Sequence, residues 1–353
     1  MNIIHPKYEI IEQQYNGDLL KDMFKHIELC GRTCYKSEDK ITDTSYEKFI
    51  KMLEDSEHGA MLEHGTVYLT ILVVSPLDDP QYIFKTDIVN FFKHNKYSEV
   101  KEESVKSYLT IYYITTNWRV IFEHKDELMC KNIFENYHIE KESLAKSILQ
   151  FITKPTEHHE KRYTVKFTCD IGVSREFNRH RKDSPAEEST RYCNYTKDKF
   201  GGELNIAKPV WISEGQYAGI GYDIFKYCYT IAQHKDQDEF TDIDYWLFAN
   251  LADEYSYMNL LRLGWKPQQA RIVLPLDTKT ELIHTAYACD WCHFFNLRAL
   301  GTTGAPHPSA KELAWPLMED FLNRNWITLD MINENKYNQI KEKYPNIEDY
   351  IKL

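Results

Sequence analysis

The alternation of apolar and polar side chains over Tyr163–Ile171 constrains the fold of this chain more than any other stretch. Apolar residues occupy every second position, and Thr, Lys, Thr and Asp stand between them. Successive side chains of a strand point to opposite faces of a sheet, so this period of two predicts a strand with one buried face. The chain then passes through Gly172 into a basic stretch that begins at Arg175. The pattern therefore predicts a strand that leads through a short helix or turn into a charged segment.

Other segments predict the elements that surround this strand. Near-continuous β-branched and aromatic runs predict strands over 66–74, 107–114 and 278–286. Apolar spacing of three and four residues predicts helices over 18–29, 45–57, 216–234, 240–263, 289–300 and 309–323. Pro267 suits the first position of a further helix, and Pro275 would end it. We therefore expect an α/β protein whose second half is mostly helical.

Length and charge limit the classes of function. The chain has 353 residues, enough for one large domain or two ordinary ones, and it carries a net charge of −11. That charge argues against broad binding to nucleic acid, so anion binding would require basic residues gathered in one place. We find no apolar run long enough for a transmembrane helix and no signal-peptide core, so we expect no membrane contact and a cytoplasmic location. Eight scattered cysteines fit a reducing compartment.

The basic stretch has two interpretations when its composition alone is considered. Arginine forks bind phosphate oxygens in pairs, which makes a phosphate site plausible here. Charge runs are more often solvated faces, and acidic neighbours could pair these residues internally. The basic residues are Arg175, Arg179, Arg181, Lys182 and Arg191 with His180, and the acidic ones are Glu176, Asp183, Glu187 and Glu188.

The order of residues 179–192 favours the first interpretation. They read Arg-His-Arg-Lys-Asp-Ser-Pro-Ala-Glu-Glu-Ser-Thr-Arg-Tyr, which resembles the signature of the flavin-dependent thymidylate synthases. Three further segments resemble elements of that family in the same order: His58-Gly-Ala-Met-Leu-Glu63-His64, Ala270-Arg271-Ile-Val-Leu-Pro275 and Phe295-Asn-Leu-Arg298. The resemblance covers roughly 18–68 and 163–325.

The resemblance implies an activity and an architecture. It implies reductive methylation of dUMP to dTMP with FAD as cofactor, NADPH as reductant and 5,10-methylenetetrahydrofolate as carbon donor. It implies an α/β (α+β) fold with a mixed, mainly antiparallel sheet and long helices. It also implies a homotetramer whose active sites take residues from different chains. We expect a single domain over 1–353, with an insertion over about 75–160 that has no counterpart in compact members of the family.

The resemblance also assigns residues. The dUMP site would comprise Glu176, Arg179, Glu187, Ser189, Arg191, Arg271 and Arg298. The FAD site would comprise His58, Arg179, His180, Arg181, Glu187 and His293. Arg298 would be catalytic, because a guanidinium against the uracil edge would stabilise negative charge that develops on the ring. Ser189 lacks the partners of an activated nucleophile, so we assign it to binding. For each histidine taken alone, a hydrogen-bonded structural role is the commoner one.

Several positions depart from the common pattern of the family. Glu176 stands where glutamine is usual, and a carboxylate near a phosphate is unfavourable unless Arg175 or Arg179 neutralises it. The other departures are Ala60, Ala186, Tyr287 and Cys289. They put the details of FAD binding in doubt. They leave room for a variant pyrimidine-nucleotide (hydroxy)methyltransferase or for a non-catalytic nucleotide-binding homologue.

Two cysteine pairs suggest a competing interpretation. Cys289-Asp-Trp-Cys292, with Cys30 and Cys34, could form a structural zinc site. Zinc ligand pairs lie at characteristic separations, and these pairs lie at opposite ends of the chain. Two small core cysteines one helical turn apart explain Cys289 and Cys292 better, so we expect no metal.

Overall fold

The centre of the molecule is an antiparallel sheet in the order β2-β6-β9-β7. The computed structural model describes residues 1–75, 79, 81–128, 147–197, 200–216, 223, 228 and 240–353. The strands of this sheet are β2 (Lys7–Ile10), β6 (Arg162–Asp170), β9 (Lys279–Tyr287) and β7 (Ser184–Glu187). β6 and β9 pair along their whole length, from Arg162 opposite Tyr287 to Asp170 opposite Lys279. The strand predicted from alternation is therefore a central strand.

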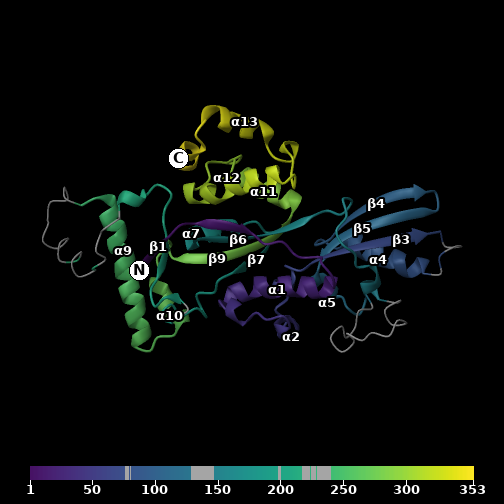
Figure 1. The fold of residues 1–353 in the computed structure, drawn as a ribbon, viewed down its shortest axis with the longest axis horizontal. Helices are drawn as coiled ribbons and strands as arrows, with labels where there is room; N and C mark the ends of the chain where they lie inside the picture. Colours follow the sequence, from purple (N-terminus) through teal and green to yellow (C-terminus); the bar gives the residue numbers. More distant parts are fainter. Residues whose placement is uncertain are drawn as a thin grey trace.

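Helices cover both faces of this sheet (Figure 1). α11 (Ala288–Arg298), α12 (Pro308–Asn323) and α13 (Glu334–Lys343) lie on one side, and α1 (Leu19–Tyr35) and α2 (Ser45–Asp55) lie on the other. Side chains from β6, β9, α11 and α12 form the main core, which includes Phe167, Trp291, Phe294 and Phe295. Each large apolar side chain buried in this way stabilises the fold by roughly 1.5–3 kcal/mol.

The prediction that β6 has one buried face is wrong. Val165, Phe167 and Cys169 are fully buried on one face, yet Thr164 and Thr168 on the other face are also buried. Hydrogen bonds make this second burial tolerable: the Thr164 and Thr285 hydroxyls lie 2.8 Å apart, and Nε2 of His26 lies 3.1 Å from the Thr164 hydroxyl. A period of two shows which face of a strand is apolar and which is polar. It does not show whether the polar face is exposed, because a second layer of helices can cover that face.

A second, three-stranded sheet extends from one end of the molecule. β3 (Thr66–Val74) pairs antiparallel with β5 (Leu109–Asn117) over nine residues, and β5 pairs with β4 (Glu99–Lys106). α4 (Tyr82–His94) and α5 (Trp118–Glu123) belong to this arm. We call residues 75–160 the inserted segment. Its extent as an insertion stays a prediction, although its strands complete a sheet with β3.

β4 had no signal in the sequence because it is an exposed edge strand. It reads Glu-Val-Lys-Glu-Glu-Ser-Val-Lys, and only Val100 is partly buried. An edge strand with both faces in solvent needs no apolar stripe, and charged side chains discourage pairing with other chains. The predicted strand over 107–114 begins two residues later, because 107 and 108 form the turn between β4 and β5.

The opposite end of the molecule carries the remaining elements. β1 (Asn2–Ile4) and β8 (Asn205–Ala207) form a separate parallel pair, so the strands of the described residues are mainly antiparallel, as expected. α9 (Asp242–Arg262) begins at a capping box in which the Thr241 side chain accepts from the Asp244 amide. α10 (Pro267–Ala270) has Pro267 at its first position. The shorter helices are α3 (Gly59–Leu62), α7 (Ile171–Phe177) and α14 (Ile347–Ile351).

Most predicted elements are confirmed. The predicted strand 66–74 matches β3, and the predicted helices in 18–29, 45–57, 240–263, 289–300 and 309–323 correspond to α1, α2, α9, α11 and α12. The predicted helix over 216–234 lies almost wholly outside the described residues. No helix in the described part of the chain is long and apolar enough to cross a membrane.

Candidate active site

The end of β6 positions the basic segment. Asp170, the last residue of the strand, caps α7 by accepting from the Val173 amide at 2.6 Å. Val173 and Phe177 of this seven-residue helix are buried in the core. Their burial turns the neighbouring residues outward, so Arg175 is exposed and Glu176 is half-buried. Local capping and packing therefore set the direction in which the charged side chains leave the sheet.

Glu176 and Arg298 form the tightest ion pair of the segment. Nη1 of Arg298 donates to Oε2 of Glu176 at 2.6 Å, and Nη2 donates to the Glu176 carbonyl at 2.7 Å. Arg298, and not Arg175 or Arg179, is therefore the arginine that neutralises Glu176. The reason is positional: α11 ends at Arg298 directly beside α7, whereas Arg175 and Arg179 point into solvent. Arg298 is half-buried, and burial lowers the pKa of its guanidinium while Glu176 raises it.

His180 is neutral and faces Arg298. Nε of Arg298 lies 3.2 Å from Nε2 of His180. Arginine has only donors, so Nε2 of His180 must be the acceptor and its ring cannot carry a second proton. Burial agrees with this geometry and lowers the pKa of His180 to about 4. The His293 ring lies 5.7 Å from the His180 ring, centroid to centroid. The structure thus brings together Glu176, His180, His293 and Arg298.

Arg175, next to Glu176 in sequence, lines a pocket of about 810 Å³ whose wall includes none of these four residues. Its walls come from α7, β7, the loop after β7 and the segment from 268 to 276. Glu187, Ser189 and Arg271, three residues of the predicted dUMP site, line it together with Arg175 and Thr190. Arg271 donates to the Thr190 hydroxyl at 3.3 Å. We call this the arginine pocket, and Arg175 is a member that our sequence-based assignment left out.

The Glu187 carboxylate is held in place at the rim of α7. It accepts from the Ser174 hydroxyl at 2.7 Å and from the Asn178 amide at 2.9 Å. Carboxylates have about four acceptor sites, so capacity remains for a hydroxyl of a bound ligand. Ser189 is fixed through its backbone, because its amide donates to the Cys34 carbonyl at 3.1 Å. Its hydroxyl accepts from the Arg191 amide at 3.3 Å, which is a local turn contact.

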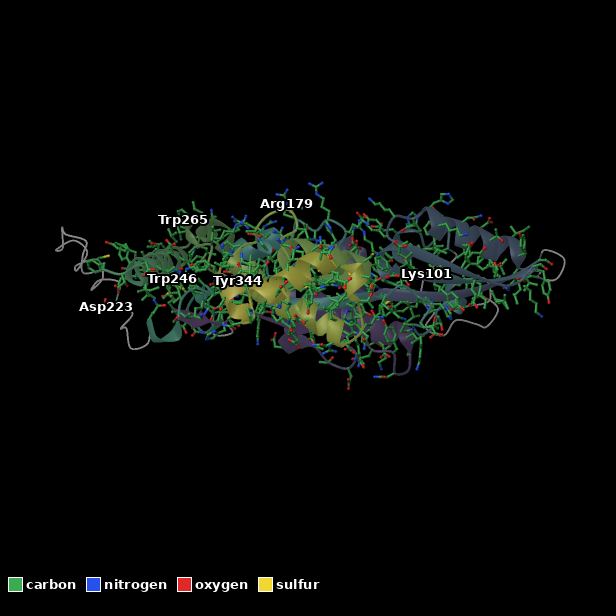
Figure 2. All side chains as sticks on the ribbon, turned by 90° about the horizontal axis from the view of Figure 1, so that it is seen from above. Lys101, Arg179, Asp223, Trp246, Trp265 and Tyr344 are labelled. Atoms are coloured by element: carbon green, nitrogen blue, oxygen red, sulfur yellow. The ribbon has the colours of Figure 1, made fainter. Side chains whose placement is uncertain are left out.

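The arginines around this pocket lack anionic partners. The exposed residues Arg175, Arg179, Arg181, Arg191 and Arg271 form no ion pair with any carboxylate in the described ranges. Figure 2 shows Arg179 at the edge of the molecule. In a chain with a net charge of −11, this concentration of unpaired positive charge creates a local field that attracts anions. The alternative of a charged loop paired internally is therefore wrong for these arginines.

A neighbouring group of acidic and basic residues, which shares Glu188 with the pocket wall, is arranged in the opposite way. Glu188 is buried and accepts from Nζ of Lys279 at 2.8 Å. Glu281 is nearly buried and pairs with Lys279 at 2.8 Å and Lys166 at 2.6 Å, and Lys36 also contacts it. We call these five residues the lysine cluster. Its members lie far apart in sequence, so no local pattern could have revealed it.

Not every assigned residue joins these groups within one chain. His58 is an exposed residue at the start of α3, and no described hydrogen bond or ring contact joins it to His180 or His293. Arg191 follows Thr190 in sequence but does not line the pocket. Its guanidinium lies over the Tyr192 ring. Arg179 and Arg181 are exposed, and His180 between them in sequence is buried.

Residues at the proposed flavin positions fit the cofactor only in part. The exposed guanidinium groups of Arg179 and Arg181 suit its diphosphate. The Tyr287 hydroxyl, however, donates to the carbonyls of Tyr97 at 3.0 Å and Thr115 at 2.8 Å. It therefore fastens the inserted segment to the end of β9 and has no proton left for a ligand. Flavin contacts at this position would have to come from neighbouring groups.

The cysteines give no support to a zinc site. Cys292 is buried in the main core, as expected, but Cys289 is exposed, so the prediction of two core cysteines is wrong for Cys289. α11 begins at Ala288, and its first turn faces outward at position 289. Among the described residues, no group of three or more His, Cys, Asp or Glu side chains is arranged to hold a metal ion.

Comparison with known proteins gives a family match and a curated relative. The thymidylate synthase complementing protein family matches residues 114–323, which is more than half of the chain. A curated flavin-dependent thymidylate synthase from Thermosipho melanesiensis is 31% identical over 138 residues, which cover 39% of this chain. The chain spans 54% of the length of that relative.

Solved structures give a weaker likeness. A UMP/dUMP methylase, PolB, from Streptomyces cacaoi bound with 5-Br dUMP is 14% identical and covers 92% of this chain and 93% of its own, with a TM-score of 0.36. The same methylase bound with 5-Br UMP gives a TM-score of 0.35 at 14% identity, over 91% of each chain. Scores this low carry no argument about this chain. The family match does, and the chain belongs to the thymidylate synthase complementing protein family, that of the flavin-dependent thymidylate synthases.

Proposed function

We propose that this protein methylates dUMP to dTMP, with 5,10-methylenetetrahydrofolate as carbon donor and NADPH as reductant. The observation that carries this proposal is the arginine pocket, which joins unpaired guanidinium groups to hydroxyl and carboxylate groups. Its volume of about 810 Å³ lies within the roughly 300–1,000 Å³ typical of small-molecule sites. A nucleoside monophosphate needs both kinds of partner, cationic for its phosphate and polar neutral for its sugar.

Each group of the pocket has a role that its chemistry supports. Arg175 and Arg271 would bind the phosphate, because guanidinium forks match phosphate oxygens. Ser189 would add a hydroxyl donor, and Glu187 would accept from a sugar hydroxyl. We also place Arg179 and Arg191 near the nucleotide, since they are exposed, unpaired and close in sequence.

Arg298 is the residue that we propose for activation of the pyrimidine ring. Its pairing with Glu176 and its contact with neutral His180 hold the guanidinium in one place before a substrate arrives. Pre-positioned positive charge stabilises negative charge that develops in a transition state without further rearrangement. A neutral His180 matters here, because an imidazolium at that position would repel Arg298.

FAD is the cofactor that we propose, with His58, Arg179, His180, Arg181, Glu187 and His293 around it. When bound, a flavin supplies the redox and one-carbon chemistry that side chains lack. The protein's own contribution is to bind the diphosphate through Arg179 and Arg181 and to align the nucleotide in the arginine pocket. The separation of His58 from His180 in one chain supports sites shared between subunits of a homotetramer.

Spectroscopy and product analysis test this proposal together. Purified protein incubated with FAD should show a flavin spectrum that NADPH bleaches without oxygen. It should form dTMP when dUMP and methylenetetrahydrofolate are added. Flavin-free protein that binds dUMP without turnover would instead indicate a non-catalytic homologue, and a hydroxymethylated product would indicate the variant transferase. A monomeric enzyme with full activity by light scattering would refute the shared site.

A further inference from the structure

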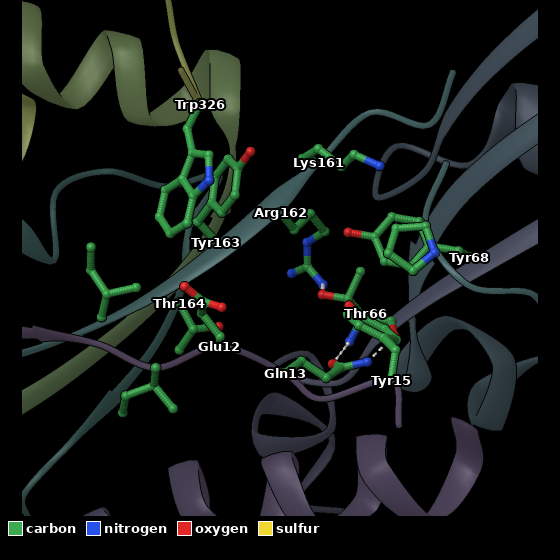
Figure 3. A pocket seen from close by; sticks show the side chains of 13 residues that line it. Glu12, Gln13, Tyr15, Thr66, Tyr68, Lys161, Arg162, Tyr163, Thr164 and Trp326 are labelled. Carbon is green, nitrogen blue, oxygen red and sulfur yellow. Dashed lines mark hydrogen bonds between the residues drawn. The ribbon is translucent and has the colours of Figure 1, made fainter. Parts of the chain in front are cut away.

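A second cavity, of about 240 Å³, lies where β2, β3 and β6 separate. Its walls come from residues 10–13, 15, 66, 68, 155, 161–164 and 326, none of which lines the arginine pocket. Figure 3 shows the side chains of Arg162, Tyr68, Tyr163 and Trp326 around this space. The start of β6 and Pro155 bring the inserted segment to this cavity, so it lies at the base of the arm.

Two cations in its wall have only neutral partners. Nη1 of Arg162 donates to the Thr66 hydroxyl at 3.2 Å, and Nη2 donates to the Glu63 carbonyl at 3.1 Å and the Ser184 hydroxyl at 3.4 Å. Nε of Arg162 has no acceptor among the described residues. Nζ of Lys161 donates to the Thr156 carbonyl. Within the described ranges, neither Lys161 nor Arg162 forms an ion pair with a carboxylate.

The single carboxylate in the wall does not compensate for these charges. Glu12 pairs with Arg324 at 3.2 Å, outside the cavity wall. Burial lowers the pKa of Lys161, and Lys101 lowers it further, while Glu160 raises it without reversing the direction. Half-buried cations without anions destabilise a fold unless a ligand or another role accounts for them. The cavity is therefore a positively charged hollow in an acidic protein.

The remaining wall is aromatic. The Tyr15 and Tyr68 rings meet edge to face with centroids 5.9 Å apart, and Tyr163 stacks on Trp326 at 4.1 Å. Ile10, Ile11 and Pro155 add apolar surface. Aromatic walls favour a flat ligand, because offset or edge-to-face ring contacts stabilise by more than the area that they bury.

We propose that this cavity is a binding site for a small aromatic carboxylate. Its carboxylate would pair with Lys161 and the free donors of Arg162, and its ring would lie against the tyrosine and tryptophan walls. The volume of about 240 Å³ is below the roughly 300–1,000 Å³ of drug-sized pockets, which limits the ligand to about one ring. The site is independent of the proposed nucleotide chemistry, since the two pockets share no residue.

Calorimetric titration of the full chain with sodium benzoate tests the proposal, with inorganic phosphate as the second arm. Benzoate should bind saturably, and Lys161→Gln and Arg162→Gln should each weaken binding by about tenfold or more, as expected for loss of a charge-assisted hydrogen bond. Lys161→Gln matters most, because Arg162 also supports Ser184 and its loss could disturb folding. Lys7→Gln on β2 removes an equal charge outside the cavity and should change nothing.

Three results would overturn the assignment. The first is the absence of saturable benzoate binding to the wild-type chain. The second is equal affinity for benzoate in Lys161→Gln and the wild type. If Arg271→Gln then weakens benzoate binding, the benzoate lies in the arginine pocket. The third is phosphate binding that depends on Lys161 while benzoate does not bind, which would assign the cavity to a different class of anion.

Discussion

The arginine pocket and the lysine cluster meet at Glu188 and use charge in opposite ways. Glu187, Glu188 and Ser189 all line the pocket, but the carboxylate of Glu188 pairs with Lys279 and so belongs to the cluster as well. In the cluster the buried carboxylates and lysines neutralise one another. In the pocket the arginines have no carboxylate partner among the described residues. The paired charges of the cluster therefore stabilise the fold, whereas the unpaired arginines of the pocket are available to bind an anionic ligand.

The largest effect that we expect concerns the lysine cluster. Burial alone would raise the pKa of Glu281, but Lys279, Lys36 and Lys166 hold it well below 4.5. Glu281→Gln removes the carboxylate that contacts all three lysines and leaves half-buried Lys166 with no ion-pair partner among the described residues, so the free energy of unfolding should fall by about 3–5 kcal/mol. Urea denaturation at pH 7 measures this loss. Glu9→Gln, an exposed change on β2, should alter it by less than about 0.5 kcal/mol.

The Glu281→Gln variant also tests how the stability of the folded state depends on pH. A carboxyl group whose pKa is lowered on folding stabilises the folded state above its unfolded value, and this contribution is lost as the pH falls below 4.5 toward the folded value. The wild-type chain should therefore lose more stability below pH 4.5 than Glu281→Gln does. Parallel stability curves for the two proteins would show that the cluster is not coupled as described.

The next effect concerns Arg298 and catalysis. Arg298→Gln removes the proposed stabilising charge, and kcat for dTMP formation should fall by about 10²–10³-fold. Steady-state kinetics with a fixed excess of flavin measures it. Arg324→Gln, at the exposed end of α12, is the matched control. If Arg298→Gln keeps its kcat and only KM rises, Arg298 binds the substrate and does not activate it.

A smaller effect follows from the neutral His180. Its pKa of about 4 lies below the ordinary 6.5, so the folded state binds fewer protons than the unfolded chain between these values. Above pH 6.5 this group costs the folded state nothing, and as the pH falls toward 4 the folded state loses on the order of 3 kcal/mol of stability. His180→Gln keeps an acceptor for Arg298 and should flatten that part of the stability curve. An unchanged slope would mean that His180 titrates normally.

The smallest effect concerns Ser189. Ser189→Ala removes one neutral hydroxyl from the arginine pocket, so dUMP affinity should fall by a few-fold, equivalent to about 0.5–1.5 kcal/mol. Turnover at saturating substrate should persist, because we assign no covalent role to this hydroxyl. Abolished turnover with intact dUMP affinity would contradict that assignment.

The sequence predicted local features of this molecule better than contacts between distant segments. Alternation and helical spacing located β3, β6, β9 and the long helices, since these depend on neighbouring residues. The pairing of Glu176 with Arg298 escaped prediction because it joins residues 122 positions apart. Tyr287 looked like a weakened flavin contact, and only the structure shows that it fastens the inserted segment through Tyr97 and Thr115.

One titration tests the central claim most directly, that the unpaired arginines form a phosphate site. Calorimetry compares dUMP with deoxyuridine, which lacks the phosphate, on the wild-type chain and on Arg271→Gln. We predict that the wild type binds dUMP far more tightly than deoxyuridine, and that Arg271→Gln weakens dUMP by about 10–100-fold while deoxyuridine is unaffected. Equal affinity of the wild type for dUMP and deoxyuridine, or unchanged dUMP binding by Arg271→Gln, would contradict the claim.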